Sequence, residues 1–238
     1  MNKWKIRVVS FSLAVTVAFA LLGLAFSPAY AWTHQINNWD NNPNDFLCGT
    51  SSDHPCLYWV QPSNTSITLQ AYLDSSLTIA PGNYNFTVAI QRAFGDWNAQ
   101  PAWNPYLNSC GSSISCEDRS NVAYTMADLG ANVYGVTYTY YGPSQWNSRN
   151  RFWYAAITLA EVNFSSRITW NNNLQFSGTT ADGRKVSTHE TGHVLGLGHT
   201  GHSPAIMRQG AVTYFSVQAD DLSGLKSIYP GFYPGSQQ

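Results

Sequence analysis

Charged side chains are scarce in this sequence, in which Lys and Arg number 12 and Asp and Glu number 13 among 238 residues. The formal charge is −1, and neither a block of like charge nor a low-complexity linker interrupts the chain. Proteins that bind nucleic acid carry a basic patch or stripe, so this composition argues against a nucleic-acid interface. Neutral polar and aromatic residues are plentiful instead, which suits an extracellular surface.

The first 31 residues have the pattern of a secretory signal peptide. Three basic residues precede an uncharged apolar stretch over residues 8–26, and Ala29-Tyr30-Ala31 follows as a small-x-small cleavage site. Removal of these basic residues leaves nine basic and thirteen acidic residues, a formal charge of −4. An uncleaved membrane anchor is the alternative, because the apolar stretch is near the length that spans a bilayer. We expect cleavage, and hence a secreted, extracellular protein that starts at Trp32.

The four cysteines form two close pairs in turn-rich sequence, Cys48 with Cys56 and Cys110 with Cys116. Behind a signal peptide, this pattern predicts two local disulfides. A metal site or a free regulatory thiol is the alternative, although neither pair has the spacing of a zinc knuckle.

Residues 32–63 are rich in Asn, Asp, Pro and Ser, and we interpret them as an N-terminal extension pinned by a disulfide. Residues 64–238 are interpreted as one compact domain. Apolar residues that recur at three- and four-residue steps predict a first helix over residues 86–99.

Segments with loose alternation or rich in aromatic and β-branched residues predict strands, and they cover residues 66–77, 121–127, 133–141, 152–164 and 167–170. A second helix is expected over residues 181–195, where Thr179-Thr180-Ala181-Asp182 has the form of a helix start with an acid at the third helical position. A third is expected over residues 217–228, before Pro230-Gly231.

His189 and His193 are four residues apart in the second predicted helix. Their imidazoles therefore project from one helical face about one turn apart, where both can bind one tetrahedral zinc. His199 supplies a third ligand if the chain leaves the helical path, and Gly196 permits this because glycine adopts positive φ at helix ends. Three neutral histidines leave the fourth position open to water, as in a catalytic zinc site.

Glu190 follows the first ligand, and its carboxylate can act as general base on zinc-bound water and pass the proton to the leaving amine. This arrangement predicts metal-assisted amide hydrolysis. A bare His-Glu-x-x-His could instead be an exposed helix with two histidines. The extended pattern, however, fixes five positions over eleven residues, which argues against a chance match and for a zinc site.

The run from His189 to His199, followed by Ser203-Pro204-Ala205-Ile206-Met207, resembles the zinc-binding and Met-turn motifs of the metzincin clan. Within that clan it is similar to the matrixins, the group that includes matrix metalloproteinases. Residues 88–97 and 219–229 resemble the first and last helices of a matrixin catalytic domain, so the resemblance covers roughly residues 66–229.

The resemblance implies an α+β, metzincin-like fold with a twisted mixed β-sheet, two long helices and a small C-terminal subdomain with a third helix. It implies that His189, His193 and His199 bind one catalytic Zn²⁺, that Glu190 is the general base, and that Met207 forms an apolar floor beneath the metal.

In such folds an edge strand above the cleft aligns the peptide substrate by β-augmentation. Residues 155–163 are the candidate strand, with Ala155, Ile157 and Leu159 as substrate-binding residues. The pocket for the side chain after the scissile bond depends on the loop over residues 211–215. Tyr214 could reach the cleft from its wall, or it could have a packing role.

Asp220 and Asp221 are expected to cap the last helix, and anchoring of the mature N-terminus is the alternative. Ca²⁺ is a second candidate cation, since acidic and Asn-rich loops are present, although none has a recognisable ligand spacing.

The resemblance implies a zinc-dependent endopeptidase that acts as a monomer on protein or peptide substrates, with no nucleic-acid partner and no membrane partner after signal cleavage. Two other functions stay open: a non-catalytic zinc-containing adhesin or binding module, and an amidase that acts on cell-wall peptides. The matrixins' cysteine switch lacks its flanking Arg and Asp pattern here. Their second zinc is doubtful, because only His34 and His54 lie outside the motif region.

Overall fold

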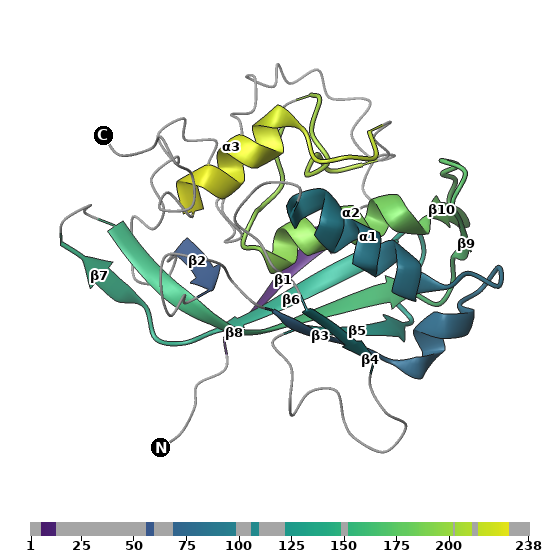
Figure 1. Cartoon of the computed structure of the whole chain (residues 1–238), viewed down its shortest axis with the longest axis horizontal. Coiled ribbons are helices and arrows are strands. Elements are labelled where there is room, and N and C mark those ends of the chain that lie inside the picture. Colours follow the sequence, from purple (N-terminus) through teal and green to yellow (C-terminus); the bar gives the residue numbers. More distant parts are fainter. Residues whose placement is uncertain are drawn as a thin grey trace.

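The computed structural model describes residues 6–12, 56–59, 69–98, 106–109, 122–148, 152–201, 203–210 and 214–228. An eight-stranded sheet with the main order β1-β6-β8-β5-β3-β4 supports the described part of the chain (Figure 1). Its strands are β1 (Ile6–Ser12), β2 (Cys56–Trp59), β3 (Gln70–Leu73), β4 (Tyr106–Ser109), β5 (Val122–Ala127), β6 (Gly135–Tyr141), β7 (Gln145–Asn147) and β8 (Phe152–Ser165). The short strands β9 (Thr169–Asn171) and β10 (Thr180–Asp182) form a separate parallel pair.

The long strand β8 lies in the interior of the sheet. It pairs in parallel with β5 and antiparallel with β6, while β2 and β7 pair with its N-terminal part. Strands β3, β4 and β5 are also parallel to one another, so the sheet is mostly parallel, whereas β6 and β7 run antiparallel to β8. This mixed sheet, together with three helices, confirms the predicted fold class.

The expectation that residues 155–163 form the edge strand is wrong. Ile157 has Trp59 of β2 on one side and Tyr141 of β6 on the other, and pairing on both sides continues along β8. The resemblance implied an edge strand, but only the strand order of the fold shows that β8 has neighbours on both sides and that β6 lies next to it. Ala155 and Ile157 are buried and Leu159 is partly buried, so the argument that made these three residues substrate contacts fails.

Two helices, α1 (Phe86–Asn98) and α2 (Gly183–Val194), lie side by side on one side of the sheet (Figure 1). The apolar stripe predicted for the first helix is buried throughout, which confirms that helix. The indole Nε1 of Trp97 donates a hydrogen bond to the carbonyl oxygen of Thr188 at 2.8 Å. This buried bond ties the end of α1 to the middle of α2.

Aromatic rings fill the space between α1 and the sheet. The rings of Phe86 and Phe164 stack with centroids 4.1 Å apart, and Trp170 meets Phe86 edge-on at 4.9 Å. Offset stacks and edge-to-face pairs are the favoured geometries of aromatic rings. The helix and strands β8 and β9 are therefore packed through one aromatic cluster.

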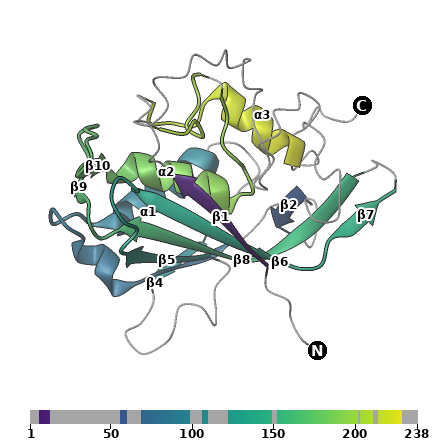
Figure 2. The same ribbon diagram turned by 180° about the vertical axis from the view of Figure 1, so that it is seen from behind.

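The third helix, α3 (Ala219–Ile228), confirms the predicted C-terminal helix. It lies beyond α2 on the side away from the sheet, as the view from behind in Figure 2 also shows. The predicted first strand is shorter than expected, because the 3₁₀ helix η1 (Ser75–Ile79) begins behind it.

The second helix begins later than predicted, at Gly183, and Asp182 is its N-cap. The preceding backbone stays extended because Thr180–Asp182 pairs with β9 as strand β10. One carboxylate oxygen of Asp182 accepts the backbone N–H of Lys185 at 2.9 Å, and the other accepts that of Leu174 at 3.0 Å. Asp182 therefore caps the N-terminus of α2 and also fixes the backbone of the loop between β9 and β10.

The predicted disulfides lie outside the described residues, since Cys48, Cys110, Cys116 and the side chain of Cys56 are not among them. Within the described ranges, no helix is both long and apolar enough to cross a membrane.

Replacement of Asp182 by alanine should lower the free energy of unfolding by about 1–3 kcal/mol, because a buried cap and a second buried acceptor are lost together. Equilibrium urea unfolding followed by circular dichroism measures the change. Asp74→Ala is the matched control: Asp74 caps η1 through the N–H of Ser76 in an exposed setting and should cost less than about 1 kcal/mol. Equal losses in the two variants would contradict the assigned role of Asp182.

Candidate metal centre

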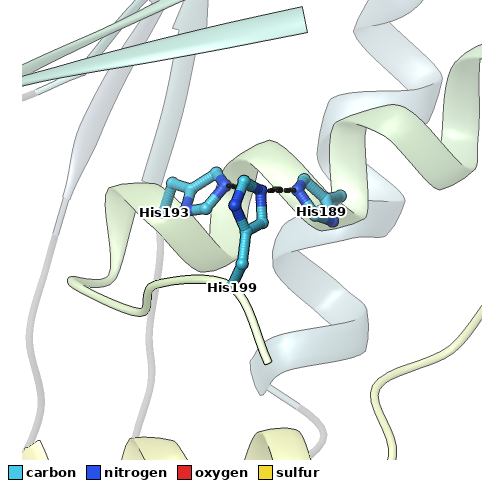
Figure 3. A group of neighbouring side chains, drawn as sticks. All are labelled: His189, His193 and His199. Atoms are coloured by element: carbon cyan, nitrogen blue, oxygen red, sulfur yellow. Dashed lines mark hydrogen bonds between the residues drawn. The ribbon is translucent and has the colours of Figure 1, made fainter. Parts of the chain in front are cut away.

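The three histidines converge because α2 ends sharply after the second of them. Gly196 has φ of +91°, and a Cβ there would lie 2.6 Å from the carbonyl oxygen of Leu57 in β2. Only glycine tolerates both that φ and that close approach. The chain then turns back, and His199 reaches the face of α2 that carries His189 and His193 (Figure 3).

The ligand atoms of the three histidines have the spacing of a tetrahedral metal site. Each pair of Nε2 atoms among His189, His193 and His199 is 3.2 Å apart, as drawn in Figure 3. Nitrogen ligands at about 2.0–2.1 Å from a tetrahedral zinc lie about 3.3–3.4 Å from one another. The spacing therefore fits zinc closely. In the part of the chain that the structure describes, this is the only clustered set of three metal-ligating side chains.

Backbone carbonyls fix the tautomers of two ligands. His189 Nδ1 lies 2.7 Å from the carbonyl oxygen of Ile206, and His193 Nδ1 lies 2.7 Å from that of Leu197. A carbonyl oxygen only accepts, so each Nδ1 carries the proton and each Nε2 presents a lone pair. Two such lone pairs 3.2 Å apart cannot hydrogen-bond to each other. The arrangement is favourable with a cation between them, which supports a metal site independently of the sequence motif.

Burial keeps the three imidazoles in the neutral form that binds metal. Desolvation is the main cause that lowers the pKa of His189 to about 4; the bond to Ile206 opposes this shift, and the charge of Lys185 adds to it. Desolvation and the neighbouring ligands likewise lower the pKa of His199 to about 3 and hold that of His193 well below its ordinary value. At neutral pH all three are therefore ready to coordinate a cation.

The carboxylate of Glu190 is fully buried between α2 and β6. The hydroxyl of Thr137 in β6 donates to its Oε2 at 2.6 Å. A Cβ on Gly135 would lie 2.7 Å from its Oε1, so the strand makes room for the carboxylate by having no side chain there. The sequence analysis missed Thr137 and Gly135, because a strand pattern does not show which of its faces meets a helix.

The Met-turn segment is held by one buried acid of α3. Asp221 accepts the backbone N–H groups of Ile206 at 2.9 Å, Met207 at 3.0 Å and Gln218 at 2.7 Å. The bond to Gln218 is the expected helix cap, whereas the other two were not foreseen. Burial raises the pKa of Asp221, and the three N–H donors act in the opposite direction. Because Ile206 also accepts from His189, Asp221 fixes the loop that orients the first ligand.

The other predicted residues of this region are placed as follows. Met207 is buried in the core. Asp220 accepts a hydrogen bond from the hydroxyl of Thr200 at 3.0 Å. Tyr214 is partly buried, with its hydroxyl 3.3 Å from that of Ser203. The rest of the predicted pocket loop, residues 211–213, lies outside the described residues.

Comparison with known proteins agrees with this geometry. Residues 137–230 match the matrixin family model, a span that contains the three histidines, Glu190 and Met207. Matrix metalloproteinase-19 of Homo sapiens is 28% identical over 125 residues, which are 48% of this chain and 24% of that protein. Matrix metalloproteinase-19 of Mus musculus is 30% identical over 74 residues, 30% of this chain and 14% of that protein. The chain thus spans about a quarter or less of the length of these relatives.

The mostly parallel sheet, its helices and the converging histidines agree with the match to the matrixin family model over residues 137–230. Over this span the chain is similar to the catalytic domain of a matrixin, and its three histidines fit a zinc site.

Zinc should stay bound to this site well below the pH at which ordinary histidines protonate. A protonated imidazole cannot be a ligand, so affinity falls as pH falls, and pKa values of about 4 for His189 and about 3 for His199 place the loss at low pH. Dialysis against a chelator at pH 7, 5.5 and 4, followed by metal analysis, should give one zinc per chain at the first two values and less at pH 4. His199→Ala should lose zinc already at pH 7. Half-loss near pH 6.5 in the wild type would show that burial does not protect the ligands.

Proposed function

We propose that this chain is a secreted endopeptidase that hydrolyses peptide bonds of extracellular proteins, with Glu190 as the general base. One combination of features carries the proposal. Three converging histidines leave a fourth metal position open, and the buried carboxylate of Glu190 follows the first of them directly in α2.

Zinc bound by His189, His193 and His199 would lower the pKa of an attacking water and polarise the scissile carbonyl. Glu190 accepts a proton from that water as its oxygen attacks the carbonyl carbon. The same carboxyl then gives the proton to the amine nitrogen as the C–N bond breaks, and Glu190 returns to its ionised form. One water is consumed, and one carboxyl terminus and one amino terminus are formed.

Thr137 orients the base in this scheme. Its hydroxyl engages Oε2 of Glu190 and so fixes the rotation of the carboxylate, whose Oε1 lies next to Gly135. The carboxylate and the hydroxyl are both fully buried, so water does not compete for the bond. The general base is therefore positioned before the substrate arrives, which is the condition for efficient proton transfer.

We place the peptide substrate along the outer edge of β6, the side that faces away from β8. There the residues of β1, from Ile6 to Ser12, pair antiparallel with Tyr141 to Gly135, which supports the view that this edge can receive an extended chain. These residues belong to the leader that the sequence predicts to be removed after Ala31. Cleavage of the leader would free the edge for β-augmentation by substrate.

Glu190→Gln should reduce kcat/KM for casein by about 10²- to 10⁴-fold. The amide can still accept the hydrogen bond from Thr137, so the shape of the site is kept, but it cannot take a proton. Zinc content serves as the control and should stay at one per chain. No casein or gelatin hydrolysis by either protein would support a zinc-containing binding module, and equal hydrolysis by both would exclude Glu190 as the base.

Thr137→Val should lower kcat about tenfold with little change in KM, because the base loses its orienting donor while the substrate surface is unchanged. Thr137→Ser keeps the hydroxyl and should stay within about threefold of the wild type. A valine variant as active as the serine variant would contradict the positioning role.

A further inference from the structure

The C-terminal end of α2 is closed by a side chain from a strand distant in sequence. A helix leaves its last four backbone carbonyls without donors from within the helix. Three of these carbonyls, in residues 191–193, accept N–H groups of the turn that follows. The carbonyl oxygen of Val194 instead accepts the indole Nε1–H of Trp59, at 2.8 Å in a buried bond. Trp59 is thus a donor that ends the metal-binding helix.

The strand that carries Trp59 also lies against the glycine turn. Strand β2 pairs in parallel with β8, so the sheet fixes its backbone. Its Leu57 carbonyl oxygen would be 2.6 Å from a Cβ on Gly196. Both Leu57 and Trp59 are buried in the core. Strand β2 therefore connects the sheet to the turn that redirects the chain toward His199.

These contacts act on two of the three metal ligands. His193 immediately precedes Val194, and its Nδ1 lies 2.7 Å from the carbonyl oxygen of Leu197 in the same turn. His199 follows two residues after Leu197. A shift of residues 194–197 would therefore change the ring orientation of His193 and the position of His199 together. Partners that orient ligands without touching the metal are typically worth about 10- to 100-fold in metal affinity.

We propose that Trp59 is a positioning residue of the metal centre, and that residues 56–59 stay in the metal-binding protein although the sequence predicts them to be part of an N-terminal extension. The inference concerns metal binding, so it goes beyond the proposed peptidase function and does not depend on it. Release of this strand would leave the carbonyl of Val194 without its donor and open a gap in the core. The mature chain therefore begins before Cys56.

Trp59→Phe tests the positioning role, because it keeps an aromatic ring and removes the N–H donor. Trp170→Phe is the matched control: the indole of Trp170 also donates a buried bond to a backbone carbonyl, that of Ser165 at 3.0 Å, but at the end of β8 and not at α2. Competition with a chromophoric chelator measures zinc affinity, and the visible spectrum of the Co²⁺-loaded protein reports the coordination geometry. Trp59→Phe should weaken zinc binding by about 10- to 100-fold and alter the Co²⁺ spectrum, whereas Trp170→Phe should stay within about twofold of the wild type even though its urea midpoint falls.

Unchanged zinc affinity in Trp59→Phe would overturn the positioning role. An equal loss of affinity in both variants would overturn it as well, because that result reports only a general loss of stability. Absence of zinc from the wild type would overturn the metal centre, and the inference with it. Should Trp59→Phe fail to fold, N-terminal sequencing of zinc-loaded wild type from cells that express the full chain decides. A chain that keeps residues 56–59 supports the proposal, and a chain that begins after Trp59 and still holds one zinc overturns it.

Discussion

Two imidazole lone pairs, those of His189 and His193, held 3.2 Å apart in the protein interior are the constraint on which the rest of the site depends. Without a cation the lone pairs repel one another, and burial denies them the protons or water that would relieve the repulsion. Metal binding and the final packing of the site are therefore coupled. The helical period places two of the ligands, whereas the third requires the turn at Gly196.

The orientation of the ligands depends on a part of the chain distant from α2 in sequence. Asp221 holds the backbone of Ile206 and Met207, and the carbonyl of Ile206 holds the ring of His189. The carboxylate is buried, but three backbone donors replace its hydration. Helix α3 thus contributes to the metal site without providing a ligand. The C-terminal helix is therefore part of the unit that shapes the metal site.

Local patterns in the sequence predicted the helices and the histidine triad, because a 3.6-residue period and a fixed ligand spacing are visible in a short segment. They failed for the edge strand, because the order of strands is set by pairing between distant segments. Residues 155–163 and β6 look equally strand-like in sequence, and only the fold shows which has two neighbours. Thr137 and Gly135 were missed for a related reason: a single hydroxyl or a single glycine has no periodicity, and its role depends on which side chain the fold places beside it.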